Sequence, residues 1–252
     1  MTKPVVFVSH ITAEGEVAQL FKNLVSAHFL GLIDVFVSSD GQTISMGQRW
    51  LDSITKALND CVIEIVVASP ESVTRPWVNF EAGAGWVRNI PVIPLCHSGL
   101  VPSALPVPLN LLQSARATDQ ADLKRIFDVL AKALGGTTPT VDFSKFIADV
   151  AAFEKQYTFW KACNAAFDVL QRALPGLVAA LIGGQDVEIE LNDKQIAIIE
   201  PHANFLGTHS ILTFNPRTAV SVGPTGNIYR SEFFRGTKFS ATVSDTSFKK
   251  PY

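Results

Sequence analysis

Residues 35–68, VFVSSDGQTISMGQRWLDSITKALNDCVIEIVVA, hold two apolar runs with an amphipathic segment between them. The runs VFV and VIEIVVA are rich in valine and isoleucine, which favours β-strands. Between them, Trp50, Ile54 and Leu58 recur every four residues, as on one face of a helix. The order predicts a strand, a crossover helix and a second strand parallel to the first.

The same alternation extends on both sides of this unit. Apolar runs lie at 5–8, 34–37, 62–68 and 91–95, with a fifth candidate strand at 115–117. Helix-like segments separate them, which predicts an α/β fold with an open, doubly wound parallel sheet. Such sheets bind ligands at the carboxyl ends of their strands. We therefore expect the chemistry in the loops that follow the first two strands, at Ser9 and His10 and from Ser38 to Asp40.

The sequence changes character after LGGTTPT, residues 134–140. We expect one domain over residues 1–136 and a C-terminal α+β module over 141–252. An apolar stripe in 143–182 predicts a helical segment of two helices, and turn signals about every ten residues then predict a small antiparallel β unit. Its expected strands include VEIELND, QIAIIE, SILTFNP, AVSVGPTGN and IYRSEFF, and residues 237–252 are expected as an edge strand or a tail.

Composition excludes several classes of protein. The net charge is −2, and no run of lysine or arginine predicts nucleic acid or an anionic membrane as a direct partner. Prolines interrupt the uncharged stretch 89–115, so we expect strand and loop there and no membrane-spanning helix. The three cysteines form no metal or disulfide pattern, and the first apolar run is too short for a signal peptide, so a cytoplasmic protein without a metal site is predicted.

The segment TRPWVNFEAGAGW, residues 74–86, places a single acid among aromatic and very small residues. Pro76 predicts the first turn of a helix, and Trp77 and Glu81, four residues apart, then share one face. Glycine destabilises a helix interior by about 1 kcal/mol relative to alanine, so the glycines indicate close approach of the backbone to a strand or a ligand. Taken alone, the segment equally fits a solvated Glu81, a core Trp77 and glycines that only pack.

The chain resembles a TIR domain (Toll/interleukin-1 receptor/resistance protein) over about residues 4–134. The resemblance is carried by VFVSH (6–10), VFVSSDGQTISMGQRWLDSITKALNDC (35–61) and WVNFE (77–81). It implies a flavodoxin-like fold and, as in bacterial members, an NAD⁺ glycohydrolase that cleaves the nicotinamide–ribose bond to give nicotinamide and ADP-ribose or a cyclic isomer. No GxGxxG follows the first strand, so NAD⁺ is expected as substrate and no cofactor is predicted.

The resemblance also implies roles for particular residues. Glu81 is the expected catalytic glutamate. The expected substrate-binding residues are Ser9, His10, Phe36 and Trp77. The expected oligomerisation loop carries Asp40, Ile44 and Gly47, and in such domains this loop of one subunit completes the pocket of the next.

The hypothesis that follows is a regulated bacterial defence or cell-death effector, which forms a homo-oligomer on activation. The C-terminal module is its expected sensor, with a nucleotide or a protein as trigger. Two alternatives stay open: a non-catalytic TIR scaffold that acts by self-association, and an enzyme like the nucleoside deoxyribosyltransferases.

The remaining polar residues predict no site of their own. Glu64 interrupts an apolar strand and is expected at a strand end or sheet edge. His202 and His209 fall in a predicted loop without further metal ligands, and His28 and His97 are interpreted as ordinary polar or core residues.

Overall fold

The computed structural model describes residues 3–38, 48–223 and 226–245. Contacts divide the chain into two compact units, Met1–Lys155 and Gln156–Tyr252. Each unit has a sheet and a hydrophobic core of its own.

The first unit is built on a parallel sheet of five strands in the order β2-β1-β3-β4-β5. The strands are β1 (Val5–Ser9), β2 (Asp34–Val37), β3 (Cys61–Ala68), β4 (Val92–Cys96) and β5 (Ala115–Arg116). All five predicted strands are confirmed, and so is the doubly wound flavodoxin-like fold, because the order reverses direction between β1 and β3. The carboxyl ends of β1 and β2 therefore lie side by side.

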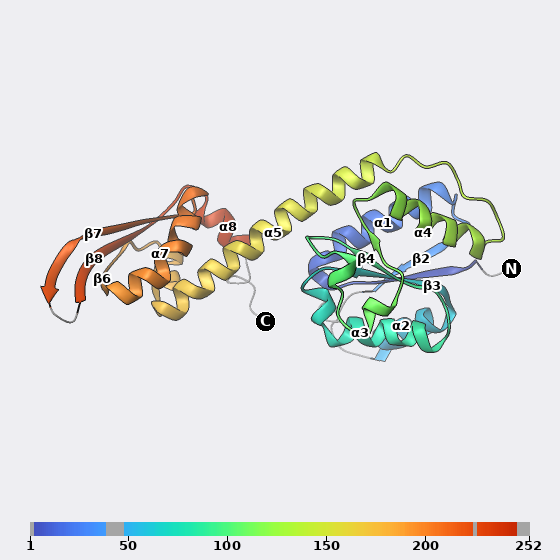
Figure 1. Cartoon of the computed structure of the whole chain (residues 1–252), viewed down its shortest axis with the longest axis horizontal. Coiled ribbons are helices and arrows are strands. Elements are labelled where there is room, and N and C mark those ends of the chain that lie inside the picture. The colour runs from blue at the N-terminus through green and yellow to red at the C-terminus, as the bar shows by residue number, and fades with distance from the viewer. Residues whose placement is uncertain (1–2, 39–47, 224–225, 246–252) are drawn as a thin grey trace. The chain divides into compact units, whose positions relative to one another are not determined.

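Four α-helices cover this sheet, α1 and α4 on one face and α2 and α3 on the other (Figure 1). They are α1 (Gly15–His28), α2 (Gln48–Asp60), α3 (Pro76–Val87) and α4 (Gln120–Ala133). Short 3₁₀ helices lie in the loops: η1 (Thr12–Glu14), η2 (Ser72–Thr74), η3 (Pro102–Ala104) and η4 (Leu109–Leu111). Because both faces are covered, seven of the eight residues of β3 are buried, as the continuous apolar run predicts.

The long helix α5 (Ser144–Ala173) belongs to both units, since the division between them falls after Lys155. Apolar residues at and near its start are buried against the first unit, where Phe143 packs on Phe127 and Phe146 on Phe21. The boundary segment predicted at residues 134–140 precedes α5 and is not helical. The contacts thus group the first part of α5 with the sheet domain.

The second unit holds an antiparallel sheet in the order β6-β8-β7. Its elements after α5 are α6 (Leu177–Ile182), β6 (Val187–Asn192), α7 (Asp193–Thr208), β7 (Leu212–Gly223), β8 (Gly226–Arg235) and α8 (Phe239–Asp245). Residues of α5, α6, α7 and all three strands share one hydrophobic core. The predicted helical segment followed by a small antiparallel β unit is confirmed.

Three local predictions in this unit are wrong. QIAIIE is helical, because Asn192 and Gln195 form a reciprocal capping box that starts α7 directly after β6. His202 consequently lies within α7, whereas His209 lies in the turn that follows the helix, so the predicted loop is wrong for His202 alone. The expected edge strand or tail contains α8, whose Phe239 and Val243 recur at helical spacing and are buried.

No helix within the described ranges is long and apolar enough to cross a membrane.

Candidate active site

Glu81 lies at the centre of a hydrogen-bonded cluster beneath α3. Ser9 Oγ donates to Glu81 Oε2 at 2.6 Å, and Ser38 Oγ donates to the same oxygen at 3.2 Å. Trp77 Nε1 donates to Oε1 at 2.8 Å. Glu81 itself has no exposed surface. A buried carboxylate is tolerated only where donors satisfy its oxygens, and here three donors do so.

The fold explains how residues distant in sequence meet at Glu81. Ser9 is the last residue of β1, and Ser38 follows β2, the parallel neighbour of β1. The Ser38 amide donates to the Val8 carbonyl at 2.9 Å, which holds Ser38 against the end of β1. The expected meeting at the carboxyl ends of the strands is confirmed for Ser9 and Ser38, and Ser39 and Asp40 lie outside the described residues.

The α3 helix supplies both the acid and one of its donors. Pro76 occupies the first turn of the helix, where its missing amide hydrogen would have no helical partner. Trp77 and Glu81 follow on one face, as their spacing predicts, and the indole bonds directly to the carboxylate. The Trp77 ring also stacks on Phe80, with centroids 5.3 Å apart and planes at 28°. Phe80 is 61% exposed, so the two rings form a flat aromatic surface beside the acid.

Phe36 and His10 occupy the surroundings of the site. Phe36 stacks on Phe7 at 5.5 Å and packs against the same apolar cluster as Trp77. His10 is buried directly after β1, where a Cβ at position 15 would lie 3.9 Å from its Nε2. His10 directly follows β1, and Phe36 pairs with Phe7 in the middle of that strand. Ser9, Ser38 and Trp77 donate the hydrogen bonds to Glu81 described above.

Sequence reasoning assigned no function to Phe80, and it placed Ser38 in a loop where chemistry was expected without giving it a role. The signal for Ser38 is a small hydroxyl residue directly after the second strand, next in the sheet to the strand that ends in Ser9. The signal for Phe80 is its spacing of three from Trp77, which places both rings on one helical face. The predicted loop residues Asp40, Ile44 and Gly47 lie outside the described residues.

The prediction for Glu64 is wrong. The residue lies in the middle of β3, the central strand of the sheet, and is fully buried. Neither carboxyl oxygen has a hydrogen-bond partner among the described residues. Burial, and secondly the charge of Glu81, raise the pKa of Glu64 to about 8, against a lowering by Arg88. An acid within a continuous apolar run was the sequence signal for an interior position.

The glycines of α3 differ in their surroundings. A Cβ at Gly85 would lie 2.3 Å from Glu64 Oε2 and 2.7 Å from Val92 Cγ2. A Cβ at Gly83 would have no heavy atom within 4 Å. The expected close approach of helix to strand is therefore confirmed at Gly85, and its partner is the Glu64 carboxyl.

A second polar cluster lies at the ends of β1 and β4. His97 Nε2 is 3.5 Å from Glu14 Oε1, and both side chains are buried. The Ser98 amide donates to Glu154 Oε1 at 2.7 Å. Within the described residues, no group of three or more His, Cys, Asp or Glu side chains is arranged to hold a metal ion.

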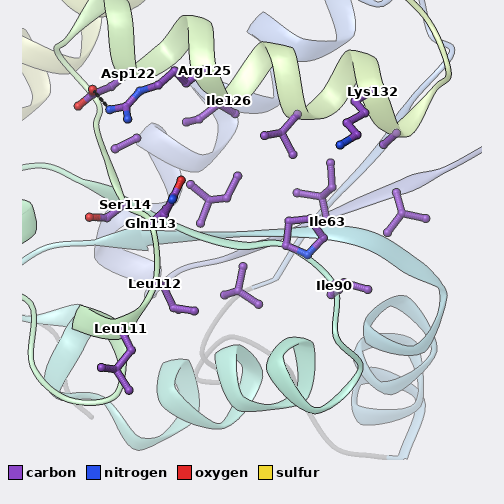
Figure 2. Close-up of a pocket in the computed structure, with 17 residues that line it drawn as sticks. Ile63, Ile90, Leu111, Leu112, Gln113, Ser114, Asp122, Arg125, Ile126 and Lys132 are labelled. Atoms are coloured by element: carbon purple, nitrogen blue, oxygen red, sulfur yellow. Dashed lines mark hydrogen bonds and ion pairs between the residues drawn. The ribbon is translucent and has the colours of Figure 1, made fainter.

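A cavity of about 720 Å³ lies elsewhere in the first unit (Figure 2). It is bounded by α4, the first residues of β3 and β4, and residues 111–115. Ile63, Ile90 and Ile126 contribute to an apolar lining, with Arg125 and Lys132 among its polar residues. Glu81 and its donors Ser9, Ser38 and Trp77 do not line this cavity, so it is separate from the candidate active site.

Comparison with known proteins identifies one family. The family model described as TIR domain matches residues 6–130. No curated protein matches the chain. Among solved structures, the sugar isomerase domain of an RpiR transcription factor from Sphaerobacter thermophilus aligns with 15% identity and a TM-score of 0.32, covering 62% of this chain and 70% of that one. At this identity and TM-score, the alignment indicates neither a shared fold nor a shared function.

Proposed function

Residues 6–130 of this chain belong to the TIR domain family, and from that premise we propose that the protein is an NAD⁺ glycohydrolase. It cleaves the nicotinamide–ribose bond and releases nicotinamide and ADP-ribose or a cyclic isomer. The observation that carries the proposal is the fully buried Glu81 with its three donors at the carboxyl ends of β1 and β2.

Cleavage of the nicotinamide–ribose bond is helped more by a negative charge beside the ribose than by a group that donates a proton. Nicotinamide leaves NAD⁺ as a neutral molecule from a cationic precursor, and the ribose becomes oxocarbenium-like. A carboxylate about 4 Å from that developing charge contributes about 4 kcal/mol at an effective dielectric constant of about 20, or about three decades in rate. Glu81 is placed to supply this stabilisation, because its donors fix its orientation before the substrate arrives.

The neighbouring residues support substrate binding. Glu81 can also accept a hydrogen bond from a ribose hydroxyl, because a carboxylate has about four acceptor positions. Trp77 and Phe80 offer a flat apolar surface for the nicotinamide ring. Ser9 and Ser38 act through Glu81, and His10 and Phe36 complete the wall of the site.

The burial of Glu81 also supports regulation. NAD⁺ can reach the fully buried Glu81 only after neighbouring atoms move apart, and we propose that Trp77 keeps its hydrogen bond to Glu81 while they do. The described conformation is then a resting state, and a signal releases it. We assign this signal to the C-terminal module, residues 141–252, with a nucleotide or protein trigger and homo-oligomer formation. An NAD⁺-consuming enzyme held inactive until triggered fits a bacterial defence or cell-death effector.

The test is nicotinamide release from NAD⁺ by the full chain at high protein concentration. Glu81→Gln removes the charge and keeps the shape, so we expect a loss of about a thousandfold. Glu16→Gln, at an exposed acid on α1, is the matched control and should keep wild-type release. Equal release by wild type and Glu81→Gln would exclude Glu81 as the catalytic glutamate.

The same samples separate the alternatives. If no NAD⁺ is cleaved even by assembled protein, and Glu81→Gln assembles like wild type, the chain is a TIR scaffold. Deoxyribosyl transfer between free nucleosides with NAD⁺ left intact would instead identify an enzyme like the nucleoside deoxyribosyltransferases.

A further inference from the structure

Two carboxyl groups lie between α3 and the sheet, and only Glu81 has a role in the proposed reaction. Glu64 projects from β3 toward α3, where its carboxyl lies under Gly85. Glu81 precedes Gly85 by four residues on the same face of the helix, a rise of about 6 Å. Both acids are fully buried. The charge of Glu81 acts on the buried Glu64 carboxyl, so two ionised carboxylates here would repel each other, and the pair holds fewer than two charges.

The surroundings of the two acids are unequal. Glu81 accepts hydrogen bonds from two hydroxyls and an indole. Glu64 has no hydrogen-bond donor on either oxygen among the described residues. Hydrogen bonds to the charged form favour ionisation, whereas burial without donors favours the neutral acid. The negative charge is therefore more stable on Glu81, and the proton on Glu64.

The packing around Glu64 keeps this difference in place. The backbone of α3 covers the carboxyl at Gly85, and the neighbours on β1 and β4 are the apolar Phe7 and Val92. Besides Glu81, the titratable and charged groups that act on Glu64 are Arg88 and Cys61. Arg88 donates to the carbonyls of Leu58 and Cys61 and to Cys61 Sγ.

We propose that Glu64 and Glu81 form a carboxyl pair that holds one proton at neutral pH, with the proton on Glu64 and the charge on Glu81. Glu64 is then a positioning residue: its neutral form lets Glu81 stay ionised beside it. The catalytic meaning of this assignment rests on the proposed cleavage of NAD⁺, because that reaction needs an ionised Glu81. The raised pKa of Glu64, about 8, agrees with the assignment.

The experiment is an infrared pH titration of the full chain without NAD⁺, from about pH 5 to about pH 10. A protonated carboxylic acid gives a carbonyl stretch that a carboxylate lacks. We expect such a band at neutral pH, with a midpoint near 8, and ¹³C-glutamate labelling should shift it. Glu64→Gln, which has the shape of the neutral acid, should abolish the band, and Glu16→Gln should leave it unchanged.

Glu81→Gln supplies the second variant and does not depend on the folding of Glu64→Gln. The band should persist, because Glu64 remains buried, but its midpoint should move to lower pH, because the neighbouring charge is gone. Absence of a glutamate band at neutral pH would overturn the proposal. Loss of the band in Glu81→Gln would also overturn it, since the proton would then belong to Glu81.

Nicotinamide release distinguishes the two proposals. If the expected band appears in a protein that never cleaves NAD⁺, the proposed carboxyl pair stands and the proposed enzymatic activity is wrong. If a protein without the band cleaves NAD⁺, the proposed enzymatic activity stands and the proposed carboxyl pair is wrong. If both proposals hold, the alkaline limb of the pH profile for NAD⁺ cleavage should change in Glu64→Gln, a readout that a purely structural role of Glu64 would not move.

Discussion

Gly85 of α3 lies directly over Glu64 of β3, so close that a Cβ at position 85 would stand 2.3 Å from Glu64 Oε2. Glycine is unfavourable within a helix, and here the contact with the sheet explains its presence. The absence of a side chain at one position of α3 thus makes room for a buried acid in the central strand.

Gly85→Ala should destabilise the first unit by about 1–3 kcal/mol, because overlap with Glu64 and Val92 outweighs the gain in helix propensity. Gly83→Ala is the matched control on the same helix, where the new methyl group meets no atom within 4 Å. It should be neutral or stabilise by up to about 1 kcal/mol. Urea unfolding of both variants measures the difference, and equal midpoints would disprove the close approach.

The stability of the protein should depend on pH through Glu64. The folded-state pKa, about 8, lies above the ordinary value of 4.5, so between these values the folded state binds the extra proton. The contribution of Glu64 to the free energy of unfolding is greatest below the pKa of the unfolded state. It falls as the pH rises and is constant above the folded-state pKa. Between these two pKa values, the titration of Glu64 lowers the free energy of unfolding by up to about 1.4 kcal/mol per pH unit.

Glu64→Gln cannot titrate and should lack this part of the pH dependence. Thermal unfolding of wild type and Glu64→Gln at a series of pH values measures it. Parallel curves for the two proteins across the window would show that Glu64 keeps an ordinary pKa.

Trp77→Phe should lower kcat/KM for NAD⁺ cleavage by roughly tenfold or more, because a hydrogen bond to a charged group contributes about 1.5–3 kcal/mol. The substitution keeps an aromatic ring beside Phe80 and removes only the N–H that donates to Glu81. Trp86→Phe, at a 46% exposed position of the same helix, is the control and should keep wild-type kinetics. A normal kcat/KM in Trp77→Phe would mean that the indole nitrogen does not hold the carboxylate during catalysis.

Ser9→Ala should reduce kcat more than Ser38→Ala does. Both hydroxyls donate to Glu81 Oε2, but the Ser9 contact is 2.6 Å long and the Ser38 contact 3.2 Å. Short, charge-assisted hydrogen bonds are the stronger ones. Steady-state kinetics of the two variants compare them directly, and a larger effect at Ser38 would reverse the ranking drawn from these distances.

Most helices and strands were predicted correctly from the sequence, because the periodicity of apolar residues is a local property of the chain. The five parallel strands and their crossover helices follow from alternating apolar runs and amphipathic segments, each readable within a short window. The same reasoning failed at QIAIIE, where an alternation of apolar and other residues indicated a strand. The capping box of Asn192 and Gln195 decided the helix there.

The candidate site was predicted in part. Glu81 and Trp77 follow from their spacing on one helix, which the sequence contains. Ser9 and Ser38 lie 72 and 43 residues before Glu81, and only the order of strands in the sheet brings them to the same oxygen.

The strand and helix pattern, the family of residues 6–130 and the acid at position 81 can be read from the amino-acid sequence. The position of Glu64, the groups that donate to Glu81 and the need for glycine at position 85 emerge from the folded chain. Periodicity reports which side of an element is buried, whereas hydrogen bonds, close packing and shared charge depend on which elements become neighbours.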